Sequence, residues 1–485
     1  MATIKVFDPV QVPVSVLQEI QQIRASLEQA RLDIERLRLD NERLRLELAE
    51  ARQQLEEARR QAKRQAAPFS KGPPSPQPKR PGRKSGTAHG RHGHRLQPAP
   101  GAIDETHEAP LPDACPGCGG EVRQTGVAAQ YQTEIPRKPL VRRFNVHLGR
   151  CRGCGKCLQG RHPLQTSDAL GAAASQLGPD AQAAVVALNK DAGLSHGKVA
   201  SVLGALFGIS LTRGASAQVV LRAAGRLGPA HQEILQDIKA SPVVTPDETG
   251  WRVGGRPAWL HAWVGGRATC YAIDPHRSAD ALERVIGIDW GGVLAHDGWS
   301  SYGRFKKATH QQCLGHVLRR AQEMLQGATR GAVRYPRQLI ALLTEAIHLR
   351  NRHLRGEVAA GALAGAKAGF DARLRRLAYP RRAVQAYDVL SGHLWRHLGE
   401  WFVFLDKPWV EATNWLAEQA IRPGVVNRKV WGGSRTEAGA KAQGVLMSVL
   451  RTCWQGRRSA LDFVSQTLRA FGNPLLQRPV LLSPR

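Results

Sequence analysis

The chain has 485 residues, which is enough for several domains, and its 42% hydrophobic content excludes a disordered protein. Lysine and arginine outnumber aspartate and glutamate by 69 to 40, which gives a net charge of +29. Such an excess predicts a polyanionic partner, with nucleic acid ahead of an anionic membrane. No apolar run approaches the roughly 18–20 residues that a bilayer span needs, and no signal peptide is recognisable. We therefore expect a cytoplasmic protein.

A heptad repeat predicts a coiled coil over residues 15–66. Asn41 falls on the seam, where a single amide favours a parallel two-stranded pairing, so we expect a homodimer or a higher oligomer. A solvated single helix is the alternative. The seam positions are Ile20, Ile23, Leu27, Ala30, Ile34, Leu37, Asn41, Leu44, Leu48, Ala51, Leu55, Ala58 and Ala62.

Residues 67–108 differ sharply in composition from the heptad repeat. The stretch 68–95 is rich in Pro, Gly, Lys and Arg and contains no acid, which predicts a disordered basic linker. Arg80, Arg83 and Lys84 are candidates for insertion into a DNA minor groove. The alternative is a tether that touches phosphates without sequence choice.

Five of the eight cysteines lie between residues 115 and 157, which argues against a secreted disulfide scaffold. Four of them form two C-x2-C pairs, and 32 residues separate the pairs. Four thiolates complete a closed tetrahedral site, so we expect a structural Zn²⁺ in a zinc-ribbon module over residues 109–165. Cys157 is a spare that can replace Cys154. The expected ligands are Cys115, Cys118, Cys151 and Cys154.

Residues 166–240 carry helical periodicity. The stretch 191–203 followed by 208–213 resembles a helix-turn-helix: a turn, a Ser or Thr cap, then another helix. An ordinary helix pair of an all-helical domain is the alternative.

From residue 242 the apolar period changes to two. The pattern predicts a strand ending at Asp247, a hairpin of strands around Gly265-Gly266, a short helix over 278–286, and a fourth strand leading into Asp297. Two carboxylates therefore close two strands. The chain is then expected to be helical, including a large insertion over residues 309–408.

The stretch 413–424 predicts a helix that ends at Pro423-Gly424. Asn414, Glu418 and Arg422 lie at i, i+4 and i+8 and so share one face. Alone, such a face is an exposed ion pair. Together with the two strand-end aspartates in a basic protein, Glu418 suits phosphoryl transfer by two Mg²⁺ or Mn²⁺ ions, which prefer oxygen ligands.

An ordered set of motifs resembles bacterial transposases of the insertion-sequence-66 family, in the DDE superfamily. The resemblance covers most of the chain from the heptad repeat onward. The chain departs from the family pattern at Trp415 and at Val430, where the family usually has asparagine. The matching pieces are Asp247-Glu-Thr-Gly-Trp251, Ala295-His-Asp-Gly-Trp-Ser-Ser-Tyr302, Cys313-Leu-Gly-His316, Asn414-x3-Glu418-x3-Arg422-Pro423, Asn427-Arg-Lys429 and Gly433-Ser434.

The resemblance implies an α/β catalytic core of ribonuclease H-like fold with a mixed sheet. This core would comprise residues 241–308 and 409–440, with a helical segment over 441–485. By resemblance, Asp247, Asp297 and Glu418 form the metal-binding catalytic triad. His316 would support the active site or a phosphate, with ordinary helix packing as the alternative. Phosphate contacts near the triad are expected from Arg422, Arg428 and Lys429.

These observations predict a DNA transposase that cleaves the ends of its mobile element and joins the freed 3′-hydroxyl to target DNA. Its partners would be the terminal inverted repeats, target DNA and accessory proteins encoded by the element, and it would associate with the bacterial nucleoid. One alternative is a domesticated architectural protein that binds DNA without cutting. The other is a nuclease of the same fold that never joins ends.

Overall fold

The structure is a computed structural model, and it divides the chain into two units, Met1–Gln132 and Thr133–Arg485, which are described separately. Within the residues it describes, no helix is long and apolar enough to cross a membrane. Arg80, Arg83 and Lys84 lie outside those residues, so their expected role in the minor groove stays a prediction. The described residues are 14–63, 97–133, 135, 138–328, 330–379, 384–471, 473 and 476–482.

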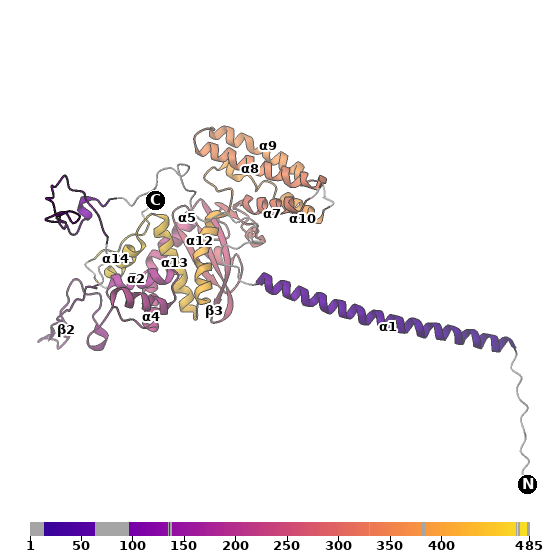
Figure 1. Ribbon diagram of the computed structural model, residues 1–485, viewed down its shortest axis with the longest axis horizontal. Coiled ribbons are helices and arrows are strands. Elements are labelled where there is room, and N and C mark those ends of the chain that lie inside the picture. Colours follow the sequence, from indigo (N-terminus) through magenta and orange to yellow (C-terminus); the bar gives the residue numbers. More distant parts are fainter. Residues whose placement is uncertain are drawn as a thin grey trace, which may run out of the picture. The chain divides into compact units, whose positions relative to one another are not determined.

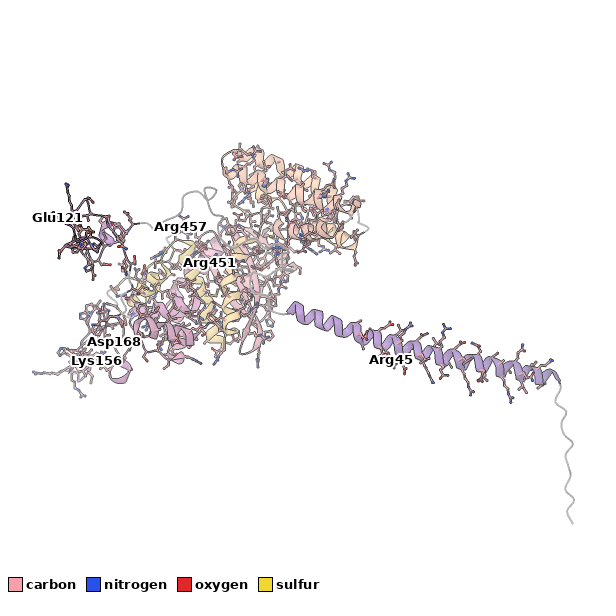
Figure 2. The ribbon with its side chains drawn as sticks, in the orientation of Figure 1. Arg45, Glu121, Lys156, Asp168, Arg451 and Arg457 are labelled. Carbon is pink, nitrogen blue, oxygen red and sulfur yellow. The ribbon has the colours of Figure 1, made fainter. Side chains whose placement is uncertain are left out.

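The first unit contains one long helix, α1 (Val14–Lys63), where the heptad repeat predicted it. Its side chains extend from all sides of the helix (Figure 2). The seam residues Ile23 and Leu37 are 60% and 61% exposed. The Asn41 amide donates to the Leu37 carbonyl one turn earlier, at 3.3 Å. The helix is confirmed, whereas its pairing with a second copy stays a prediction.

The second unit is built on a five-stranded sheet with the order β5-β4-β3-β6-β7. β4 and β5 are antiparallel neighbours, as the predicted hairpin requires. β3 is also antiparallel to β4, and β6 and β7 run parallel to β3. The bounds are β3 Val243–Val253, β4 Arg256–Val264, β5 Thr269–Asp274, β6 Val293–His296 and β7 Thr309–Gln312.

Strand β7 corrects the sequence prediction, which made residues 309–408 wholly helical. Its residues, Thr-His-Gln-Gln, lack the apolar alternation that marks a strand. Gln311 and Gln312 are nevertheless buried, and the side-chain NH₂ group of each donates hydrogen bonds. The Gln311 amide donates to the Trp401 carbonyl at 3.0 Å.

The edge strand β5 is covered by helix α13 (Glu437–Gln455). The hydroxyl of Ser448 accepts from the backbone N–H of Tyr271 at 2.8 Å, and that of Thr452 accepts from Thr269 at 3.1 Å. A Cβ on Gly444 would lie 2.9 Å from the Tyr271 carbonyl oxygen, so only glycine permits this approach. The hydroxyl groups of α13 thus accept from backbone N–H groups of β5 that would have no partner if this edge of the sheet were exposed.

Four helices precede the sheet and share its core, so residues 166–240 do not form a separate globule. Ile234, Trp263 and Leu446 belong to one buried cluster that joins these helices, the sheet and α13. The expected caps are present: Ser195 accepts from Lys198 N–H and Thr212 from Ala215 N–H. The helices are α2 Pro179–Lys190, α3 His196–Phe207, α4 Arg213–Arg226 and α5 Gly228–Ala240, and α14 (Ala460–Phe471) packs on α2.

A helical insertion follows β7 and has its own core, in which Leu339, Leu374 and Phe402 are buried. Figure 1 shows α7–α10 gathered beyond one end of the sheet. Its helices are α7 Leu314–Gly327, α8 Arg334–Leu354, α9 Ala360–Ala378, α10 Gln385–Arg396 and α11 Val403–Asp406, and a short α6 (Asp280–Ile286) connects β5 to β6.

Candidate active site

Asp247 and Asp297 occupy matching positions on neighbouring parallel strands. Val244 of β3 pairs with Leu294 of β6, and each aspartate lies three residues further along its strand. Asp297 directly follows β6, as predicted. The prediction that the first strand ends at Asp247 is wrong: β3 continues to Val253, because its second half pairs with β4 after leaving β6. The aspartates therefore flank the point where β3 and β6 part.

Asp247 lies in a strongly acidic environment. Its pKa is raised to about 7, first by burial and then by the carboxylates of Glu248, Asp297 and Glu418, against a hydrogen bond from the Glu248 N–H at 2.9 Å. Asp297 in turn accepts a hydrogen bond from the Trp299 N–H at 3.0 Å. Three predicted ligands thus come close enough to interact electrostatically.

Glu418 lies in the first turn of α12 (Trp415–Trp431), with its side chain 46% exposed. His316 of α7 approaches it, with Nε2 at 3.7 Å from the Glu418 Oε1 atom. The neighbouring Cys313 sulfur and then the carboxylates of Asp297 and Glu418 raise the pKa of His316, against its burial. His316 therefore contacts the predicted triad rather than serving only in helix packing.

The residue before α12 ties this helix to β3. Asn414 is buried, and its side-chain amide donates to the Pro246 carbonyl at 3.3 Å. Its backbone N–H donates to the Cys313 sulfur at 3.1 Å. Asn414 is therefore not part of an exposed face with Glu418, as the i, i+4 spacing suggested. It fixes where the helix begins.

Comparison with protein families identifies this arrangement of strands and helix. A model of the Transposase IS66 family matches residues 174–442, which is more than half of the chain and includes all three carboxylates. The chain belongs to the Transposase IS66 family. No curated protein matches it. The resemblance seen in the sequence is thus confirmed, and with it a transposase function in general.

In this transposase, α12 passes through Pro423, which corrects the predicted end at Pro423-Gly424. A proline removes one helical hydrogen bond, but packing on the sheet outweighs that loss. The carbonyl of Ala420, three residues earlier, accepts from the Tyr271 hydroxyl at 2.6 Å. A Cβ at Gly424 would collide with Leu260 of β4, so the glycine marks a close contact rather than a helix end.

A buried cluster behind Asp247 was missed in the sequence. Successive strand residues point to opposite faces, so Glu248 lies on the other face of β3, where its side chain is only 2% exposed. It accepts from Arg277 at 2.8 Å and from the Tyr302 hydroxyl at 2.9 Å. Trp259 and Trp299 flank the guanidinium, with ring centroids 5.0 and 4.9 Å away. In the sequence, only the alternation of side chains along the strand could have indicated that Glu248 lies on the face opposite Asp247.

The three cations expected near Glu418 differ in their surroundings. Arg422 and Lys429 are exposed on α12, as a phosphate contact requires. Arg428 is half-buried, and its guanidinium donates to the Gly250 carbonyl of β3. Arg428 therefore holds α12 against the strand, and its predicted phosphate contact stays a prediction.

The donor set near Asp247 fits a hard divalent cation such as Mg²⁺, because it consists of oxygen atoms with an excess of negative charge. The buried Oδ1 of Asn414 adds an acceptor that has no partner among the described residues. As placed, however, no three histidine, cysteine, aspartate or glutamate side chains in the described ranges are grouped closely enough to hold a metal ion.

The two cysteine pairs form matching turns. The N–H groups of Gly119 and Gly155 donate to the carbonyls of Cys115 and Cys151, at 2.8 and 2.9 Å. Backbone N–H groups lower the pKa of both Cys115 and Cys151, which favours thiolate. Cys118 lies in the first unit and Cys154 in the second; Cys157 begins β2 (Cys157–Gln159), which pairs with β1 (Leu148–Arg150). Zinc binding by all four stays a prediction.

Proposed function

We propose that the protein cleaves the ends of a mobile element and joins them to target DNA, with Asp247, Asp297 and Glu418 as the catalytic carboxylates. The observation that carries this proposal is geometric: Asp247 and Asp297 each lie three residues after the paired Val244 and Leu294, and the helix that begins just before Glu418 is tied to β3 by Asn414. The strand order, three antiparallel strands followed by two parallel ones, supports a ribonuclease H-like core.

In this mechanism the three carboxylates would hold two Mg²⁺ or Mn²⁺ ions. Bound there, the ions would supply charge that activates the attacking oxygen and stabilises the leaving one. The chain itself orients the reactants. Asn414 keeps the start of α12 against β3, and His316 restrains the Glu418 carboxylate. Sites on strands and helices give the rigidity that this chemistry needs.

Two successive displacements at phosphorus account for cutting and joining. Water attacks the phosphodiester at the element end, and the bond to the 3′-oxygen breaks, which leaves a 3′-hydroxyl and a 5′-phosphate. That hydroxyl then attacks a phosphodiester of target DNA and displaces its 3′-oxygen. Arg422 and Lys429, exposed on the same helix as Glu418, would bind flanking phosphates.

The direct test replaces each carboxylate by its amide, as Asp247→Asn, Asp297→Asn and Glu418→Gln. The substrate is duplex DNA from the ends of the element that encodes the chain, with Mg²⁺ present. The rates of cleavage and joining should fall at least ~10²-fold in each variant, as they do when an enzyme loses one group that stabilises the transition state electrostatically. DNA affinity should stay the same or rise, since a charge that repels phosphate is removed.

Glu437→Gln is the matched control, because Glu437 also lies exposed in the first turn of a helix. Glu411 is less suitable, since it pairs with Arg350 at 3.0 Å. Full activity in the carboxamide variants would refute the assignment of the triad. Nicks without joined products would indicate a nuclease, and neither product from the wild type would indicate an architectural protein.

A further inference from the structure

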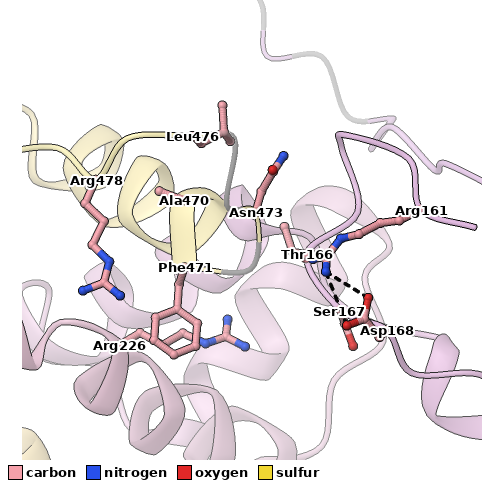
Figure 3. Close-up of a pocket in the computed structure, with 10 residues that line it drawn as sticks. All are labelled: Arg161, Thr166, Ser167, Asp168, Arg226, Ala470, Phe471, Asn473, Leu476 and Arg478. Carbon is pink, nitrogen blue, oxygen red and sulfur yellow. Dashed lines mark hydrogen bonds and ion pairs between the residues drawn. The ribbon is translucent and has the colours of Figure 1, made fainter.

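The second unit also contains a polar pocket, which lies away from the carboxylates of the candidate active site. It lies between the ends of α4 and α14 and the segment after β2, and encloses about 510 Å³. Its wall includes Arg161, Asp168, Arg226, Phe471 and Arg478, and Figure 3 shows how these side chains converge. No residue of the candidate active site lines it.

Two arginines carry the charge of this pocket. The guanidinium carbons of Arg226 and Arg478 lie 5.2 and 5.7 Å from the centroid of the Phe471 ring, and Figure 3 shows them to either side of it. Within the part of the chain that the structure describes, neither has an ion pair with an acid. Burial, and then the charge of Arg222, lowers the pKa of Arg226. Two positive charges therefore have no carboxylate partner among the described residues.

The remaining wall is already ordered. Arg161 forms an ion pair with Asp168 at 3.0 Å, so Arg161 balances the negative charge of Asp168. Asn473 is buried and donates to the Pro163 carbonyl, which ties the segment after α14 to that after β2. Since Phe471 holds the two guanidiniums by cation–π contact, its ring serves the arginines rather than a nucleotide base. The pocket thus offers hydrogen-bond donors of a kind that suits a phosphate group.

We propose that this pocket binds a backbone phosphate of DNA, at a contact separate from the catalytic carboxylates. The proposal rests on the proposed action on DNA, and the chain's net charge of +29 favours DNA as the source of the phosphate. Arginine forks match phosphate oxygens in geometry as well as charge. Free phosphate has the same chemistry, so the test includes it as a separate arm.

The test uses the full chain and measures the affinity for a duplex of element-end DNA across a series of salt concentrations. Arg226→Gln/Arg478→Gln should lower affinity at low salt by at least about tenfold, and its plot of log affinity against log salt should be shallower by about 0.9, the contribution of one phosphate. Arg478→Gln alone removes an exposed side chain and should give a smaller loss without a risk to folding. Arg451→Gln is the control, because Arg451 also stacks on an aromatic ring, at 3.9 Å from Trp454, but does not line the pocket.

Unchanged affinity and salt dependence in both pocket variants would overturn the proposal. In the second arm, inorganic phosphate is titrated against thermal unfolding. Phosphate that stabilises the wild type but not the double variant, with DNA binding unaffected, would assign the pocket to free phosphate and overturn the DNA contact. A wild type that binds DNA through the pocket but never cleaves would contradict the proposed function alone.

Discussion

The side-chain amide of Asn414 donates to the carbonyl oxygen of Pro246 at 3.3 Å, and Pro246 immediately precedes Asp247. One hydrogen bond thus joins the start of the helix that carries Glu418 to the strand that carries Asp247. Asn414 is 1% exposed, so water does not compete for this hydrogen bond. The separation of the two carboxylates depends on this bond.

Asn414→Ala should therefore lower cleavage although all three carboxylates stay in place. Supporting partners of metal ligands typically contribute about 10- to 100-fold, and we expect a loss in that range. DNA affinity should not change, because the buried amide is out of reach of DNA. The measurement compares single-turnover cleavage with equilibrium DNA binding. Cleavage equal to that of the wild type would show that the bond does not position the site.

The pair formed by Glu248 and Arg277 should stabilise the fold behind Asp247. Arg277→Gln leaves a buried carboxylate with only the Tyr302 hydroxyl as a partner, so the free energy of unfolding should fall by about 2 kcal/mol. Adding Glu248→Gln should recover part of that loss, because the unpaired charge is then gone. Denaturant unfolding of the two single variants and the double variant gives the coupling energy, expected at about 1–3 kcal/mol. Additive effects would argue against a direct pair.

The coiled-coil prediction concerns Asn41. A peptide of residues 15–65 should be helical and dimeric in sedimentation, since the exposed seam of α1 offers an apolar stripe to a second copy. Asn41→Leu should raise the melting temperature and loosen the choice of oligomer, because a seam amide costs stability while it selects two strands. A monomeric peptide would exclude pairing through this helix.

The zinc prediction concerns the four cysteines. A fragment of residues 105–165 should bind one zinc ion and lose its fold on addition of a strong chelator, because a closed site contributes folding free energy. Cys118→Ser should have the same effect as the chelator. Cys157→Ser should be mild, because Cys157 lies in strand β2 rather than in a turn. Zinc titration with a colorimetric indicator measures zinc binding by the wild-type fragment and by each variant. If Cys157 proves essential for zinc binding, the ligand assignment must change.

The sequence predicted those parts of the site that depend on local pattern. Period-two alternation indicated β3 to β6, and Asp297 stands where it was expected, directly after its strand. Propensity failed where tertiary contacts dominate. Pro423 and Gly424 are strong helix terminators by themselves, but α12 continues because Gly424 fits against Leu260.

Polar elements of the core were also hidden from the sequence. β7 is stabilised by amide hydrogen bonds, so no apolar period marks Gln311 or Gln312. The partners of Glu248, Arg277 and Tyr302, lie 29 and 54 residues further along the chain, and no local rule links them to it. The contact of Arg428 with Gly250 was hidden for the same reason, because it joins residues that are 178 positions apart.

Lys190 provides a prediction for pH. It is buried at the end of α2, where its amine donates to the Gln443 amide oxygen at 2.5 Å and lies 5.3 Å from the Trp431 ring. Burial lowers its pKa from 10.5 to about 7. Between these values the unfolded chain binds a proton that the folded chain does not. Stability should therefore rise with pH across this window, by at most ~1.4 kcal/mol per pH unit, and below pH 7 this contribution should be constant.

Lys190→Met should remove that slope and raise stability near neutral pH, because a buried apolar chain replaces one that must give up a proton or carry an unpaired charge. The measurement is the difference between wild type and variant in the free energy of unfolding, from denaturant curves at pH 6 to 10. Lys198→Met, which changes an exposed lysine on α3, should leave the wild-type slope intact. If Lys190→Met keeps the same pH dependence as the wild type, the amine is solvated in solution, and its contact with Gln443 does not persist there.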